Sequence, residues 1–170
     1  MLFSIILGPL IVAACRSAQS HLRLPIPHGK IVMDSFVGKY ERTCAEKYDE
    51  FLKALDVNFL LRKAATVSSP VMEVSKEGDL WSIKTSTSLK SMELNFEIGK
   101  EFEETTADGR DVTACVTLDG NKLVTVQKAK KAGEKSTKSV REFTGDEVIQ
   151  TMTIDGVDDL ECVQKFKRIS

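Results

Sequence analysis

From residue 70 to its end, the chain is a succession of short alternating runs separated by turn residues. Motifs such as Glu77-Gly78-Asp79 and Asp119-Gly120-Asn121 separate several of the runs, and such residues favour tight hairpins. The expected strands span residues 71–76, 80–87, 89–98, 101–105, 110–118, 122–128, 136–143, 148–154 and 160–167. Because every connection is short, neighbouring strands in the sequence are expected to pair as antiparallel neighbours in space.

The segment before this succession adds one strand and two helices. Residues 36–44 alternate weakly and are expected to form the first strand, which brings the total to ten. Across residues 45–67, apolar residues such as Tyr48 and Phe51 recur at helical spacing, which indicates amphipathic helix. Asn58 interrupts this region and suits the N-cap of a second helix. The region is therefore predicted to be a helix-turn-helix hairpin.

Ten antiparallel strands in one sheet would leave two unpaired edges unless the sheet closes on itself. The sequence therefore predicts an all-β, up-and-down antiparallel barrel with the helical hairpin over one end. A barrel of ten strands is too wide to be filled by its own side chains. We expect its interior to hold a small ligand.

The first 33 residues differ from the rest of the chain. Residues 3–15 form an apolar run that is too short to span a bilayer as a helix. Residues 20–30 contain Pro25, Pro27 and Gly29 and suit a linker. We interpret residues 1–33 as an N-terminal extension, either a signal-like segment or a gene-model artefact. Residues 34–170 are expected to form one domain.

Composition narrows the function of this domain. The chain has 24 basic and 25 acidic residues and a net charge of -1, which argues against nucleic-acid binding. Both histidines, His21 and His28, lie in the extension, so the domain has no Ser/His or Cys/His pair for catalysis. It shows no phosphate loop and no metal-ligand spacing. We expect neither an enzyme, nor a cofactor, nor a metal site.

Cysteine usage indicates the compartment. Three of the four cysteines, Cys44, Cys115 and Cys162, lie in the domain. An odd number favours free thiols and a cytoplasmic protein. Cys115 and Cys162 fall within strand patterns and are expected to be small buried hydrophobes.

The last expected strand places a polar group on an otherwise apolar face. Cys162, Gln164 and Phe166 alternate toward one side. A buried amide needs a hydrogen-bond partner. In the run that ends at residue 143, Arg141 lies on the same face as Phe143. If both strands line one interior, Arg141 and Gln164 point into the same space and a polar group must meet them there.

Residues 33–168 resemble the intracellular lipid-binding proteins, the family of fatty-acid-binding and retinoid-binding proteins, and are closest to the fatty-acid-binding group. The motifs that carry the resemblance are Phe36-Val37-Gly38-Lys39-Tyr40, Val57-Asn58-Phe59-Leu60-Leu61-Arg62, the run at residues 96–110, and Val116-Thr117-Leu118-Asp119-Gly120. Members of this family are ten-stranded, lipocalin-like clam barrels of the calycin type with a helical lid, the fold that the residue pattern predicts.

The resemblance implies non-covalent binding and transport of long-chain fatty acids in the cytoplasm by a monomer. Arg141 matches the first of two arginines that hold the carboxylate in the family. The second arginine and a tyrosine form an Arg-x-Tyr motif, which reads Gln164-Lys165-Phe166 here and is similar to the retinol-binding branch. The alternatives are a carrier of a neutral retinoid or other hydrophobic ligand, and a secreted or tethered lipid-storage protein.

Further candidate residues follow from the same resemblance. Tyr48, Phe51, Leu89 and Asp108 match positions around the lid and the portal, and each is alternatively a packing or turn residue. Strand parity places Gln127, Thr125 and Gln150 on the interior face, where they would anchor water. Glu104 or water is the alternative partner of Arg141. The basic run at residues 128–138 suits transient contact with an anionic membrane or, as we favour, a solvated turn.

Overall fold

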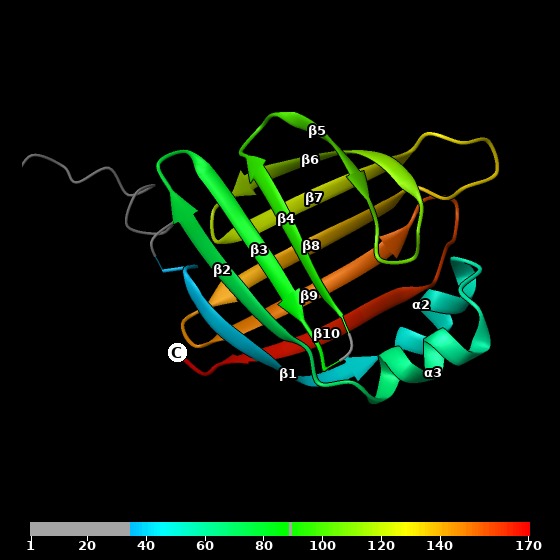
Figure 1. Ribbon diagram of the computed structural model, residues 1–170, viewed down its shortest axis with the longest axis horizontal. Coiled ribbons are helices and arrows are strands. Elements are labelled where there is room, and N and C mark those ends of the chain that lie inside the picture. The colour runs from blue at the N-terminus through cyan, green and yellow to red at the C-terminus, as the bar shows by residue number, and fades with distance from the viewer. Residues whose placement is uncertain (1–34, 89) are drawn as a thin grey trace, which may run out of the picture.

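Ten antiparallel strands form one sheet in the order β4-β3-β2-β1-β10-β9-β8-β7-β6-β5, as the computed structural model shows for residues 35–88 and 90–170 (Figure 1). The strands are β1 (Gly38–Glu46), β2 (Val71–Glu77), β3 (Leu80–Ser86), β4 (Ser91–Glu97), β5 (Glu101–Thr105), β6 (Asp111–Asp119), β7 (Lys122–Ala129), β8 (Thr137–Thr144), β9 (Glu147–Ile154) and β10 (Glu161–Arg168). The predicted barrel is confirmed. The predicted extension over residues 1–33 and the candidate Leu89 lie outside the described residues.

Alternation along the strands divides the barrel into two kinds of inner wall. Buried side chains from β2, β3 and β4 are apolar, for example Met72, Trp81 and Phe96. The inner faces of β7 to β10 also bury polar side chains, namely Thr125, Thr137, Gln150 and Gln164. One wall therefore suits a hydrocarbon, and the other offers hydrogen bonds.

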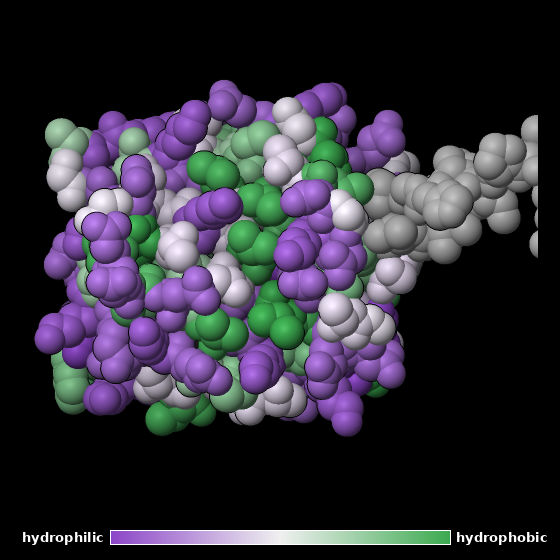
Figure 2. Space-filling view, turned by 180° about the vertical axis from the view of Figure 1, so that it is seen from behind, coloured by the Kyte–Doolittle hydropathy of each residue, from purple (hydrophilic) through white to green (hydrophobic). Residues whose placement is uncertain are grey.

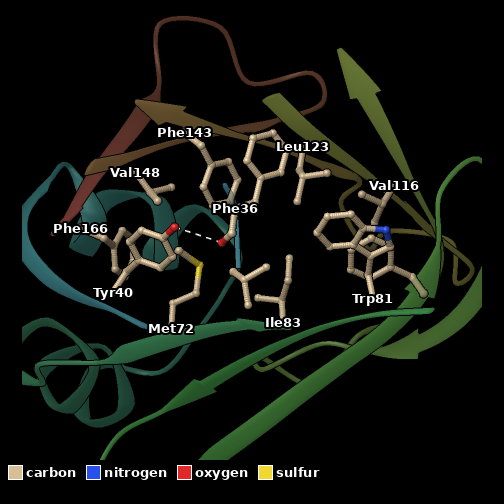
Figure 3. Close-up of a cluster of buried hydrophobic side chains, with 12 residues drawn as sticks. Phe36, Tyr40, Met72, Trp81, Ile83, Val116, Leu123, Phe143, Val148 and Phe166 are labelled. Atoms are coloured by element: carbon tan, nitrogen blue, oxygen red, sulfur yellow. Dashed lines mark hydrogen bonds between the residues drawn. The ribbon is translucent and has the colours of Figure 1, made fainter. Parts of the chain in front are cut away.

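The floor of the barrel is an aromatic cluster. Phe36 stacks on Phe143 with ring centroids 4.2 Å apart, and the Tyr40 hydroxyl donates to the Phe36 carbonyl at 3.0 Å (Figure 3). Arg168 donates to the carbonyls of Ser35 and Val37 at 2.7 and 2.8 Å. Its guanidinium also lies over the Tyr40 ring, 4.6 Å from the centroid. These contacts bring the two ends of the domain together.

Gly38 is required beside this cation. Its φ is +153°, and a Cβ built there would lie 2.0 Å from Arg168 Nη1. A side chain would therefore both strain the backbone and displace the guanidinium that closes the floor.

Strands β4 and β5 are the edges of the sheet and do not pair with each other. The space between them is bridged from the inside by Phe96 of β4 and Phe102 of β5, whose ring centroids are 6.3 Å apart. Next to it, the Gly99 N–H donates to the Val116 carbonyl of β6 at 2.8 Å. The barrel thus closes here through side chains rather than through a ladder of main-chain bonds.

The helical hairpin covers the end of the barrel opposite the C-terminus (Figure 1). It consists of α2 (Tyr48–Ala54) and α3 (Phe59–Val67). Asn58 caps α3, as predicted, by accepting from the Leu61 N–H at 3.0 Å. Phe51 is the one buried residue of α2, whereas none of the nine residues of α3 is buried. The lid therefore packs on the barrel mainly through α2.

The outer wall corrects one expectation about the cysteines. Cys162 is fully buried, but Cys115 is half-buried on the outer face of β6, where it borders a shallow hollow of about 280 Å³. The neighbouring outward residues on β7 and β8 include Val124 and Val140, which lie opposite each other. Seen from behind, hydrophobic side chains lie among the hydrophilic ones on this side (Figure 2). Membership of a strand alone misplaced Cys115, because alternation puts it on the outer face with Thr113 and Thr117, opposite the buried Val112, Ala114 and Val116.

Candidate functional site

Arg141 is a cation on the inner face of β8. Its Nη1 donates to Thr125 Oγ1 at 3.1 Å, and its Nε is buried without a hydrogen-bond partner among the described residues. Burial lowers the pKa of Arg141 from 12.5 to about 10, and the charge of Glu104 acts in the opposite direction. The side chain nevertheless keeps some accessible surface. Arg141 thus lies deep in the protein and borders space inside the barrel.

Three polar side chains form a row across adjacent strands. Gln150 of β9 lies opposite Arg141 of β8 on one side and opposite Gln164 of β10 on the other. Both glutamines are buried. Side chains directly opposite each other in a sheet are about 5 Å apart at Cβ. We call Arg141, Gln150 and Gln164 the polar row; it confirms that Arg141 and Gln164 share one interior.

A second polar group lies along the same wall. Gln127 donates to Glu104 Oε2 at 2.7 Å and accepts from the Thr137 hydroxyl at 2.7 Å. Among the described residues, Glu104 makes no ion pair with Arg141, and its Oε2 accepts from Gln127 instead. The Ser139 hydroxyl, on the inner face of β8, is buried without a partner within the part of the chain that the structure describes. Gln127 is therefore an internal bridge, and Ser139 adds a free donor near Arg141.

The end of the polar row meets the lid. Burial raises the pKa of Tyr48, while the nearby positive charge of Arg42 lowers it. Tyr48 also packs against the cluster of Phe51, Ile154 and Cys162. Burial raises the pKa of Cys162 to about 12, which keeps this thiol protonated and unreactive. Tyr48 therefore packs the lid against Cys162, which lies two residues from Gln164 on the same face of β10.

The other candidates lie apart from the polar row. Phe166 belongs to the buried cluster at the floor, and Phe51 anchors α2 on Ile154 and Cys162. Asp108 lies in the turn between β5 and β6, where it accepts from Arg110 Nε at 2.5 Å. Burial would raise the pKa of Asp108, but hydrogen bonds from Arg110 and Thr106 lower it further than burial raises it. Asp108 holds the turn beside the lid.

Arg42 was not among the candidates. It is on β1, and its guanidinium lies 5.2 Å from the centroid of the Tyr48 ring. Strand alternation could have identified Arg42 as an inward-facing residue, because it follows Tyr40 by two residues and so shares its inner face. A β-bulge between Arg42 and Cys44 changes the pairing at this point, and alternation cannot predict such a bulge.

Metal sites, membrane-spanning helices and surface hollows are further features that the described residues could provide. Residues 35–88 and 90–170 contain no cluster of three His, Cys, Asp or Glu residues that could hold a metal. No helix in the same ranges is long and apolar enough to cross a membrane. A hollow of about 290 Å³ lies on the surface between β5, β6 and the loop after β7, lined by residues that include Glu103, Asp111 and Lys130. It does not include Arg141.

A ten-stranded clam barrel with a helix-turn-helix lid and a partly polar interior defines the class of this protein. Residues 37–169 match the lipocalin / cytosolic fatty-acid binding protein family. The chain belongs to this family.

Two of the similar relatives are named for different ligands. The chain is 46% identical over 121 residues to a fatty acid-binding protein of Tyrophagus putrescentiae, covering 71% of this chain and 89% of the relative. It is 41% identical over 140 residues to human cellular retinoic acid-binding protein 2, covering 80% and 99%. A solved structure of a Schistosoma mansoni fatty acid binding protein in complex with arachidonic acid is similar, with a TM-score of 0.74, 28% identity and coverage of 82% and 99%.

Proposed function

We propose that this protein binds one long-chain fatty acid inside the barrel and carries it without covalent chemistry, with the carboxylate at Arg141. The observation that carries the proposal is the guanidinium itself. It lies deep in the protein, it has a free Nε, and no carboxylate among the described residues lies within ion-pair distance of it. An unpaired buried cation is costly, and a carboxylate ligand would both pair with it and form charge-assisted hydrogen bonds.

The apolar wall supports the same ligand class. Met72, Ile83 and Phe96 face inward from β2, β3 and β4, and a hydrocarbon chain lying against them would be removed from water. The names of the relatives agree with a hydrophobic acid, because they include fatty acid-binding and retinoic acid-binding proteins. We infer a carrier rather than an enzyme, since the proposed site offers an anchor and an apolar wall and no nucleophile–base pair.

The second candidate is a neutral retinoid or another uncharged lipid. Gln150 and Gln164 provide two amides beside one arginine, and Phe166 lacks a hydroxyl. An amide can donate to a carboxylate and can also accept from an alcohol. The polar row therefore favours an acid through Arg141 and tolerates an alcohol through the glutamines.

A competition experiment on delipidated protein separates the two candidates. The probe is 11-(dansylamino)undecanoic acid, displaced in parallel by oleic acid, oleyl alcohol, retinoic acid and retinol. We expect oleic acid to displace it at least tenfold more strongly than oleyl alcohol, as for one charge-assisted contact, and Arg141→Gln to abolish the difference. Equal displacement by acids and alcohols in the wild type would refute the anchor and favour the neutral ligand. Because oleic acid and retinoic acid share a carboxylate and differ in their apolar parts, comparing them shows whether the barrel prefers a hydrocarbon chain or a retinoid.

We further infer a cytoplasmic monomer. The three described cysteines are free thiols, and Cys44 is exposed, which suits a reducing compartment. Lys130 and Lys131, at the tip of the basic loop, pair with Glu103 and Asp111. These pairs leave less free positive charge than the sequence suggests, so we favour a solvated turn over membrane contact. Light scattering on the purified chain tests the monomer, and N-terminal sequencing of the native protein tests the extension.

A further inference from the structure

We propose that two cations of the barrel, Arg42 and Lys135, latch the helical lid closed by binding the C-terminal carbonyls of its two helices, and that this latch sets the rate of ligand exchange. Only the effect on ligand exchange rests on the proposed function, because it requires that a fatty acid is the ligand. The latch itself is argued from contacts within the protein.

Helix α3 needs such a latch because apolar packing does not hold it down. Phe59, Leu60 and Leu61 are 62%, 77% and 60% exposed. A helix of nine residues is marginal alone, and helices in proteins normally depend on burying an apolar face. The last turn of α3 carries no basic residue of its own, so its free carbonyls and the negative end of its dipole lack a cation from within the helix.

Arg42 supplies that cation from β1. Its Nη2 donates to the carbonyls of Ala65 and Thr66 at 3.2 and 3.4 Å and also contacts the Ser68 carbonyl. The Tyr48 ring of α2 lies against the same guanidinium. Among residues 35–88 and 90–170, no carboxylate lies within ion-pair distance of Arg42, so its charge is directed to the end of α3. One side chain thus joins the barrel to both lid helices.

Lys135 does the same for α2 from the loop between β7 and β8. Its Nζ donates to the Ala54 carbonyl, the last residue of α2, at 2.6 Å. The Lys135 backbone is held in turn, because its carbonyl accepts from Arg110 Nη1. Asp108 orients Arg110 from the turn between β5 and β6. The loop, the turn and the lid therefore meet through one lysine.

Opening the lid must break both cation contacts, whereas neither cation touches the polar row. Removing a latch should therefore speed ligand entry and exit by the same factor and leave the equilibrium constant unchanged. A residue that contacts ligand would instead change the equilibrium constant, mostly through the exit rate. Charge-assisted contacts at a partly exposed site should also weaken with salt.

The first test needs no ligand. Hydrogen–deuterium exchange on the delipidated full chain compares Arg42→Gln, Lys135→Gln and the wild type, with Lys76→Gln as the matched control. Lys76 also lies near an aromatic ring, 5.4 Å from Trp81, but on β2, away from the lid. We expect exchange to rise about tenfold in α3 for Arg42→Gln, as for one charge-assisted bond, and at the end of α2 for Lys135→Gln. Unchanged exchange in either helix would overturn that half of the latch.

The second test measures exchange of the probe by stopped flow. With 11-(dansylamino)undecanoic acid, we expect Arg42→Gln to raise the entry and exit rates together about tenfold, and Arg42→Lys to restore part of the wild-type rate. Added salt should accelerate probe exchange in the wild type more than in a variant that combines Arg42→Gln and Lys135→Gln. A higher dissociation constant with an unchanged entry rate would make Arg42 a ligand contact and refute the latch. If the wild type did not bind the probe, the fatty-acid proposal would fail, while the first test would still decide the latch.

Discussion

Arg141 carries a positive charge that no described carboxylate pairs with. Its folded pKa of about 10 lies below the ordinary 12.5, so the unfolded chain holds this proton more tightly than the folded one. The fold is therefore destabilised by the charge at all pH values below the folded pKa, and the penalty fades as the pH rises through 10 toward 12.5. The same side chain that would bind an acid weakens the ligand-free protein.

We predict that Arg141→Gln stabilises the delipidated protein by roughly 1–4 kcal/mol near neutral pH, the range found when buried ion pairs are replaced by hydrophobic residues. Urea unfolding followed by Trp81 fluorescence measures this, and the gain should shrink when it is repeated above pH 10. An oleic acid complex should reverse the order, since only the wild type gains from the ligand. A variant that is less stable than the wild type without ligand would show that the Thr125 contact outweighs the burial of charge.

Gln150 provides a second prediction at this scale. Because it lies between Arg141 and Gln164, Gln150→Leu should weaken binding of both oleic acid and retinol by roughly three- to tenfold, the effect of one lost hydrogen bond. Displacement titrations measure it. Thr151→Val on the outer face of β9 is the matched control and should change nothing. If only one of the two ligands bound more weakly, Gln150 would be shown to contact the head group of that ligand and not of the other.

Sequence periodicity predicted that Arg141 and Gln164 face inward, because parity depends only on extended backbone. It did not show that Gln150 joins them in one row, because lateral position depends on the register that each hairpin turn sets. Periodicity also could not predict the packing of Tyr48 against Cys162 or the Arg42 contacts with α3. Both contacts depend on how the lid docks, and no local pattern encodes that.

The turn between β5 and β6 is the element that links the barrel wall to the lid. We predict that Asp108→Asn destabilises the protein by roughly 1–2 kcal/mol near neutral pH, because Arg110 loses its charged acceptor in a mostly buried site. The folded pKa of Asp108 is lowered, so its contribution is present above the unfolded value of about 3.8 and is lost as the pH falls through the folded value.

Thermal unfolding of both proteins across this acid range tests the prediction. The gap between them should close at low pH, where the wild-type carboxyl is also protonated. Asp111→Asn is the control: Asp111 pairs with Lys131 at 2.9 Å on the surface, with 47% of its side chain exposed, and should contribute nothing measurable. If the difference in stability between the wild type and Asp108→Asn persisted at low pH, the packing of the side chain, rather than its charge, would be what stabilises the turn.

At the scale of the whole molecule, the number of strands, their antiparallel order and the lid were all predictable from the sequence, because short connections leave few topologies. The position of the unpaired edges was not. Turn residues between β4 and β5 resemble those of any hairpin, including Gly99, yet the two strands separate there. What closes the barrel at that point is a contact between Phe96 and Phe102, which pairing rules do not describe.

This contact yields the last prediction. Phe102→Ala removes the ring that spans the two edges, so the free energy of unfolding should fall by roughly 1–3 kcal/mol, below the full cost of a fully buried phenylalanine because Phe102 is only partly buried. Urea unfolding read from Trp81, which stacks on Phe96 at 6.5 Å, reports it directly. Phe59→Ala on the lid is the matched control and should have little effect, since Phe59 is 62% exposed. If both variants lost the same stability, the aromatic bridge would have no special part in closing the barrel. If Phe102→Ala alone lost stability, the edges would be shown to be held by side chains.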